Sequence, residues 1–347
     1  MHRLRAGDWV EVRSKEEVLN SLDKNGRLDE LPFMPQMFQY CGRRFKVFKR
    51  AHKTCDTVSG NWLGRRLSNC VHLELRCDGQ AHGGCQAACL IFWKEAWLKP
   101  ASKSNSLSNN ETQRDGASVD DHACTEEDVW KGTRAQQVSD ETRFVCQATQ
   151  LLNFTTPLPW YDVRQYVEDY TSGNATLGRI FRGAVYFSYY YGSLAYRGRL
   201  GRPARWLYDR FQALWGGVPY PRRLGTIAAG QPTPAVTLAL QPGEVVRVKS
   251  FQEILATIDT RYFNRGLAFD AEMAPYCGST YRVRTRVSKF IDEKTGKMKT
   301  LKTPAVILEG VYCQSRYSSC RMFCPRSIYP WWREIWLERV PDRSPTG

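Results

Sequence analysis

The chain has 347 residues, of which 42% are hydrophobic, so it is long enough for two or three domains with hydrophobic cores. Its net charge of +15 favours anionic partners, namely nucleic acid, an acidic protein surface or anionic lipid. No run of about 18 apolar residues occurs, which excludes a clear membrane-spanning helix. Residues 1–12 lack the apolar stretch of a secretory signal, so we expect a cytoplasmic protein whose twelve cysteines are metal ligands or catalytic groups.

Residues 1–99 and 241–347 repeat each other. The two copies share an opening pattern, GDWVEVRS (7–14) and GEVVRVKS (243–250). They also share a closing aromatic motif, WKEAWL (93–98) and WREIWL (332–337). Cys41 and Cys77 of the first copy correspond to Cys277 and Cys313 of the second. The offset between the copies is 236 residues at both of these cysteine positions. This agreement predicts a duplicated module at the two ends of the chain.

Each copy opens with alternating apolar residues, which predicts a strand. Ser14 with Glu17, and Ser250 with Glu253, have the spacing of a capping box and predict a short helix after that strand. Further strands are expected over four stretches: RFKVFKR (44–50), VHLELR (71–76), TYRVRTRV (280–287) and AVILEGVY (305–312). The opening strand resembles that of SH3-like barrels, which implies a small, mostly antiparallel β module.

Two different stretches separate the copies. Residues 100–142 are rich in Ser, Asn and acidic side chains and are predicted to be a disordered acidic linker. Residues 143–240 are expected to form an Arg-rich helical region, with helical periodicity in three segments: 160–170, 177–199 and 202–217. The predicted fold class is therefore α+β, with two duplicated β-rich, four-cysteine modules flanking this region. The aromatic segment 180–196 is interpreted as a buried helix, and contact with a membrane interface is the alternative.

The cysteines of each copy have the spacing of a metal site. Two cysteines four residues apart share a face of a helical turn, and two more from neighbouring strands complete a tetrahedral four-sulfur set. All five His lie before residue 123, so the second site must use cysteine alone. We predict two structural Zn²⁺ sites, in which Cys85 and Cys89 correspond to Cys320 and Cys324. The full ligand sets are Cys41, Cys77, Cys85 and Cys89, and Cys277, Cys313, Cys320 and Cys324, with His82 as an alternative ligand. An iron–sulfur cluster, disulfides and plain burial are the other interpretations.

Basic and apolar residues alternate in two of the predicted strands, which would place most cations on one face. The predicted anion-binding residues are Arg43, Arg44, Lys46, Lys49, Arg50, Arg282, Arg284 and Arg286. The alternative is a pair of edge strands whose charges prevent edge-to-edge pairing. Cys55 lies beside His52 and Lys53, whose charges would lower its thiol pKa, so it is the weak candidate for a catalytic residue.

No phosphate-binding glycine loop, HExxH or GxSxG motif occurs in a suitable context. The leading hypothesis is a non-enzymatic zinc protein that binds an anionic partner, with nucleic acid first and an acidic protein surface second. One alternative is a protein–protein adaptor in a biosynthetic or membrane-adjacent assembly, with exposed anchors at Trp93, Trp97, Trp332 and Trp336. The other is a thiol-dependent or iron–sulfur redox enzyme. The substrate, the physiological partner and the oligomeric state are left open.

Overall fold

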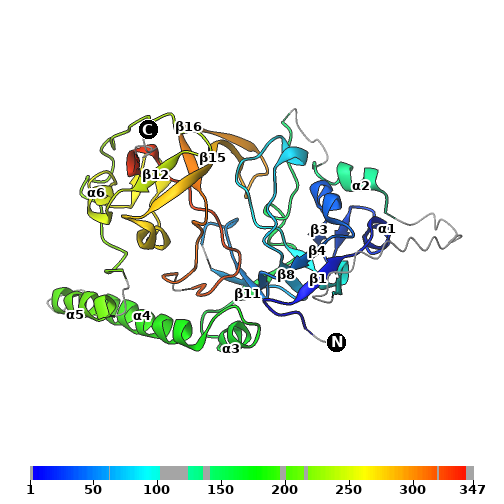
Figure 1. The fold of residues 1–347 in the computed structure, drawn as a ribbon, viewed down its shortest axis with the longest axis horizontal. Helices are drawn as coiled ribbons and strands as arrows, with labels where there is room; N and C mark the ends of the chain where they lie inside the picture. Colours follow the sequence, from blue (N-terminus) through cyan, green and yellow to red (C-terminus); the bar gives the residue numbers. More distant parts are fainter. Residues whose placement is uncertain are drawn as a thin grey trace, which may run out of the picture. The chain divides into compact units, whose positions relative to one another are not determined.

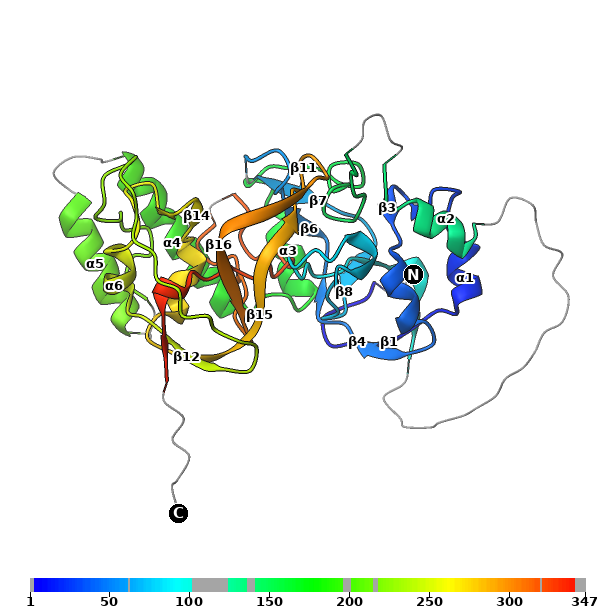
Figure 2. The same cartoon turned by 90° about the horizontal axis from the view of Figure 1, so that it is seen from above.

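A computed structural model describes residues 3–61, 63–101, 124–135, 141–195, 201–214, 218–318 and 320–340 (Figures 1 and 2). Helices and several small antiparallel sheets make the chain an α+β protein. It divides into two compact units, the first formed by Met1–Ala175 with Ile291–Met298 and the second by Thr176–Phe290 with Lys299–Gly347. Most of the predicted acidic linker, residues 102–123 and 136–140, lies outside the described residues.

The first unit contains three small antiparallel sheets and one ribbon, in the strand orders β10–β1–β4, β5–β8–β9, β11–β7–β6 and β2–β3. The strands are β1 (Trp9–Val12), β2 (Arg27–Leu28), β3 (Leu31–Pro32), β4 (Arg44–Lys46), β5 (Lys49–Arg50), β6 (Lys53–Cys55), β7 (Gly64–Arg66), β8 (Cys70–His72), β9 (Trp93–Lys94), β10 (Leu98–Pro100) and β11 (Thr156–Leu158). The helices are α1 (Lys15–Leu19), α2 (Glu126–Lys131) and α3 (Arg164–Thr171), with 3₁₀ turns η1 (Pro35–Tyr40), η2 (Gln80–His82) and η3 (Glu95–Trp97).

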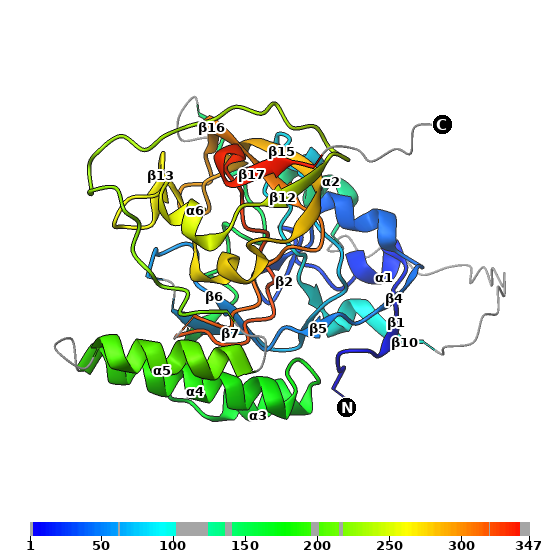
Figure 3. The same ribbon diagram turned by 60° about the vertical axis from the view of Figure 1, so that its left-hand side comes forward.

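The second unit is built on one four-stranded sheet in the order β16–β15–β12–β17, with a separate ribbon β13–β14. Its strands are β12 (Val245–Val248), β13 (Phe263–Asn264), β14 (Leu267–Ala268), β15 (Thr280–Ile291), β16 (Met298–Leu308) and β17 (Leu337–Arg339). Its helices are α4 (Leu177–Ala195), α5 (Gly201–Leu214) and α6 (Phe251–Leu255), with η4 (Ala271–Tyr276) and η5 (Glu334–Trp336). Helices α4 and α5 run side by side (Figure 3).

Local sequence signals explain most of these elements. Both predicted capping boxes are formed: the backbone N–H of Glu17 donates to Ser14 Oγ at 3.1 Å, and that of Glu253 donates to Ser250 Oγ at 3.3 Å. The predicted helices of the central region are present as α3, α4 and α5. Helix α2 was not expected, because it lies within the acidic stretch. Thr125 caps it and Val129 buries its apolar side.

The same strand registers recur in the two units. Trp9 pairs with Lys46 in the first unit, and Val245 pairs with Arg282 in the second, 236 residues later. The register of the first strand with the closing strand is also the same in both units, since Val12 pairs with Leu98 and Val248 pairs with Leu337. The offset at the closing strand is 239 residues. A one-residue slip would turn every side chain to the opposite face, so identical registers place equivalent residues in equivalent environments.

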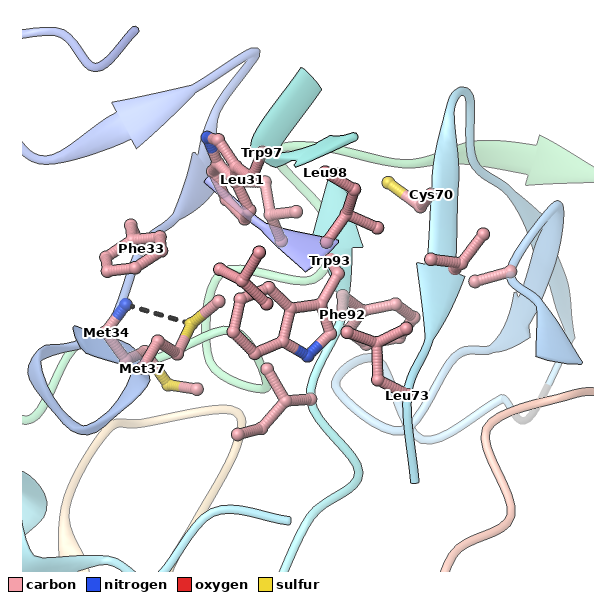
Figure 4. Packing of buried hydrophobic residues seen from close by; sticks show 14 of the residues in the cluster. Leu31, Phe33, Met34, Met37, Cys70, Leu73, Phe92, Trp93, Trp97 and Leu98 are labelled. Carbon is pink, nitrogen blue, oxygen red and sulfur yellow. Dashed lines mark hydrogen bonds between the residues drawn. The ribbon is translucent and has the colours of Figure 1, made fainter. Parts of the chain in front are cut away.

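The cores of the two units use the same aromatic arrangement. In the first unit, Phe33 lies edge-on against Trp97, with ring centroids 5.1 Å apart (Figure 4). In the second, Phe269 meets Trp336 at 5.4 Å with nearly the same angle between the rings. The four tryptophans expected as exposed anchors, Trp93, Trp97, Trp332 and Trp336, are all 0% exposed. That expectation is wrong, because these rings form the two hydrophobic cores.

Helix α4 contains most of the aromatic segment 180–196, whose last residue lies outside the described part of the chain. Tyr186, on this helix, is 2% exposed and packs against Tyr208 and Tyr317 in the second unit. Among the described residues, no helix is both long enough and apolar enough to cross a membrane.

Candidate functional site

The first cysteine loop runs from Cys77 to Cys89 and is closed at its base by the backbone. The N–H of Cys77 donates to the carbonyl of Cys89 at 2.9 Å. Gly79 has a φ of +73°, and a Cβ at this position would overlap the carbonyl of Cys85. Glycine is therefore required there, because any side chain would force the loop apart.

Two further thiols, Cys85 and Cys146, lie near Cys77 in this loop region. The pKa of Cys77 is raised to about 12, mainly by burial and in part by negative charge on Cys146 and Cys85. Gln36 Nε2 lies 3.1 Å from Cys77 Sγ and donates to it. Burial also raises the pKa of Cys146. Cys146 is not among the ligands predicted from the sequence, because it lies outside the repeated segment and has no counterpart in the second copy.

Cys41 and Cys277 occupy equivalent places at the ends of η1 and η4. The N–H of Cys41 donates to Phe38, and that of Cys277 donates to Ala274. Burial raises the pKa of both thiols, to about 12 for Cys277. These positions match the sequence alignment of the two copies.

The second loop differs from the predicted alignment. Cys313 donates its N–H to the carbonyl of Ile328 at 2.7 Å, where the first loop has Cys77 donating to Cys89. Ile328, and not Cys324, therefore occupies the place of Cys89. The second loop therefore closes three residues later than the first, so Cys324 lies inside the loop whereas Cys89 lies at its base.

Among the described residues, no group of three or more His, Cys, Asp or Glu side chains is placed to hold a metal ion. His82, the alternative ligand, is 1% exposed, and burial lowers its pKa. Its Nε2 lies 3.1 Å from the carbonyl of Val145, so Nδ1 is the ring nitrogen without a hydrogen-bond partner among the described residues. Zinc ligation stays a prediction of the sequence.

The candidate catalytic residue Cys55 is 4% exposed at the end of β6. The cations beside it in the sequence serve other contacts. Lys53 Nζ lies 2.5 Å from Asp169 Oδ2 on α3, and His52 Nε2 lies 3.2 Å from Asp169 Oδ1. Lys53, His52 and Asp169 form a buried charged cluster that joins β6 to α3, which the sequence analysis did not foresee.

Two of the eight predicted anion-binding residues have a structural role. Arg50 is 8% exposed, and its guanidinium donates to Leu4 O at 2.9 Å and to Glu95 at 2.7 Å. Arg286 repeats this arrangement, donating to Leu240 O and lying 3.6 Å from Glu334. Both arginines bind the glutamate of the closing aromatic motif, so we leave them out of the candidate surface.

The remaining basic residues of the first unit lie on or beside short strands. Arg44 is paired with Glu11 at 3.0 Å, and Arg43 lies over the rings of Tyr40 and Phe45. Lys46 is exposed on β4, and Lys49 contacts the ring of Phe48. This surface therefore contains an acidic residue as well as cations.

In the second unit the basic residues lie on a long β-hairpin, formed by β15 and β16 (Figure 2). Arg282 and Arg284 are exposed on β15, while Val283 and Val287 between and beyond them are 0% exposed. The strand is therefore cationic on one face and apolar on the other. Within the described part of the chain, neither arginine is ion-paired: Arg282 donates to Gly243 O, and Arg284 lies over the Tyr329 ring at 5.6 Å. Lys302 is exposed on β16.

No family model, curated protein sequence or solved structure matches this chain. The candidate site is therefore defined by the geometry of the hairpin and the cysteine loops.

Proposed function

We propose that this protein binds nucleic acid, and that the β15–β16 hairpin supplies the contact surface. The observation that carries the proposal is the exposed cationic face of β15, defined by Arg282 and Arg284, on a hairpin with strands of 12 and 11 residues. Arg282 lies where β15 pairs with β12, so this cationic face is part of the four-stranded sheet, and its guanidinium groups can donate to the phosphate oxygens of a nucleic-acid backbone.

The geometry of the two arginines supports phosphate binding. Each guanidinium has five N–H donors, and the contact of Arg282 with Gly243 uses one end of its side chain. The ring of Tyr329 beneath Arg284 holds that guanidinium over an aromatic surface. Donors that are positioned before binding lose less entropy when they meet an anion.

The binding test is an anisotropy titration of a fluorescent DNA duplex and of single-stranded RNA across about 50 to 200 mM salt. We expect affinity to fall steeply with salt, and the Arg282→Gln/Arg284→Gln variant to reduce the slope of log K against log salt by about two. The control is Arg210→Gln/Arg261→Gln, which removes the same charge from exposed positions away from the hairpin. If both variants weaken nucleic-acid binding equally, the net charge of the chain and not the β15 surface accounts for binding. Binding that is absent or insensitive to salt would refute the proposal.

We also propose that the cysteine loops hold structural zinc. The equivalent positions of Cys41 and Cys277, and the backbone closure of the loop between Cys77 and Cys89, support this proposal. Elemental analysis of protein purified without oxygen should give about two zinc per chain and no visible colour. Cys77→Ser and Cys313→Ser should each remove one zinc, and Cys124→Ser, a change at another buried cysteine, should remove none. If the protein contains iron and sulfide, the site is an iron–sulfur cluster and not zinc. A metal-free, colourless protein would refute both the zinc and the iron–sulfur interpretation.

A further inference from the structure

The second unit contains a cavity of about 220 Å³ between α4, α5 and the segment around residue 316. Three arginines and three tyrosines are among its lining residues: Arg179, Arg182, Arg316, Tyr186, Tyr208 and Tyr317. The described residues that line it include no Asp or Glu. None of the lining residues belongs to the cationic face of β15, so a ligand of this cavity would bind independently of nucleic acid.

The local sequence places these groups together. Arg179, Arg182 and Tyr186 are spaced by three and four residues, so they share one face of α4. Gly183 lies between them, and a Cβ there would collide with Met322 and Phe323. Glycine at this position therefore lets Met322 and Phe323 pack directly on the helix.

The segment that presents Arg316 and Tyr317 is fixed by a buried carboxylate. Glu272 is 4% exposed and accepts from the backbone N–H groups of Arg316 and Tyr317 at 3.0 and 2.6 Å. Ser318 Oγ donates to the same side chain. These bonds occupy the oxygens of Glu272 with backbone and hydroxyl donors and hold the exposed Arg316 at the cavity.

The tyrosine hydroxyls of the cavity differ in their hydrogen bonding. Tyr186 Oη accepts from Arg222 Nε at 3.1 Å. Tyr208 is 4% exposed, and its hydroxyl has no hydrogen-bond partner among the described residues. A buried hydroxyl without a partner is destabilising, so it marks a place where a ligand oxygen would be stabilising.

We propose that this cavity binds a small organic phosphate with an aromatic body. Guanidinium groups donate in pairs to the oxygens of a phosphoryl group, and the three arginines supply those donors. The tyrosine rings supply an aromatic wall, and the Tyr208 hydroxyl supplies a buried donor. A cavity of about 150 Å³ accommodates benzene, so this one has room for a ring with a charged substituent.

The test uses phenyl phosphate as the probe, with inorganic phosphate and phenol as its two halves, in calorimetric titrations of the full chain. We expect saturable binding of phenyl phosphate at one site and weaker binding of either half. Arg316→Gln should weaken binding about tenfold or more. Arg210→Gln is the matched control, because Arg210 is exposed on α5 and does not line the cavity.

Tyr208→Phe separates ligand binding from stability. Removing a buried hydroxyl that has no partner should leave the melting temperature of the free protein unchanged or higher, while phenyl phosphate binds about tenfold more weakly. Three results would overturn the proposal: no saturable binding, equal affinity for phosphate and phenyl phosphate, or equal weakening by Arg316→Gln and Arg210→Gln.

Discussion

Replacing Lys53 by Met tests whether the buried cluster of Lys53, His52 and Asp169 holds β6 to α3. Lys53 and Asp169 are 2% and 0% exposed, and Lys53 Nζ lies 2.5 Å from the carboxylate. Among the described residues, Lys53 is the one with a hydrogen bond to that carboxylate. His52 Nε2 lies 3.2 Å away and donates instead toward the carbonyl of Gln165. Lys53→Met keeps most of the volume but removes the ammonium group that hydrogen-bonds the buried carboxylate of Asp169, while His52 stays 3.2 Å from it.

The expected loss is about 3–5 kcal/mol of unfolding free energy, the range found when one member of a buried pair is removed. The loss comes mainly from the carboxylate that has lost its ammonium partner, so the double variant Lys53→Met/Asp169→Leu should recover most of it. Urea denaturation followed by circular dichroism measures both values. Added salt should change the difference little, because the pair is shielded from solvent. A single-variant loss below about 1 kcal/mol would refute the reasoning.

Three further predictions concern stability. Arg50→Gln should lower the unfolding free energy by about 2–3 kcal/mol in the same urea assay. Arg286→Gln should lower it by less than about 1 kcal/mol, because the Arg286 side chain is 31% exposed and lies 3.6 Å from Glu334. Gly79→Ala should cost about 1–3 kcal/mol, because a Cβ there overlaps the Cys85 carbonyl at a positive φ, whereas Gly42→Ala, at a similar φ with open space, should cost less. Burial raises the pKa of Glu272 above its ordinary value of 4.5, so the folded chain keeps a proton that the unfolded chain releases. Stability relative to Glu272→Gln should therefore be greatest below pH 4.5 and fall as the pH rises through the folded pKa, and a melting series with the opposite trend would contradict this.

The sequence predicted the features that depend on nearby residues. The capping boxes at Ser14 and Ser250 need only a partner three positions away, and both are formed. The alternation of Arg282, Val283 and Arg284 was enough to place cations on one face of a strand. The buried state of Arg50 could not be seen in this way, because its partner Glu95 is 45 residues distant.

The candidate cysteine loops show the same limit. The equivalence of Cys41 and Cys277 follows from a constant offset, and the structure agrees with it. The longer second loop was not visible in the sequence, because the cysteine spacing alone does not show at which residue the backbone closes the loop. Cys146 reaches the first loop from outside the repeat, and only the folded chain brings it near Cys77.

A reversed ion pair distinguishes the two copies on this face of the described chain. In the first unit, Glu11 on β1 pairs with Lys99 across the sheet at 2.9 Å and also with Arg44. In the second, the same register pairs Arg247 with Glu338 at 2.7 Å, so β12 presents a base where β1 presents an acid. The position next to Arg282 on that face is therefore basic where the first unit is acidic.

Exchanging this pair tests whether the charge beside Arg282 affects binding, without changing the net charge. Arg247→Glu/Glu338→Lys would restore the first unit's polarity, and the new Glu would lie diagonally across from Arg282, within reach of a long side chain. Because both arrangements are exposed cross-strand pairs, the unfolding free energy should change by less than about 0.5 kcal/mol. Nucleic-acid affinity should fall, with a shallower salt dependence, since the Glu competes with phosphate for Arg282. If affinity stays the same while stability is preserved, then the local charge beside β15 does not govern binding, and only the overall charge of the chain does.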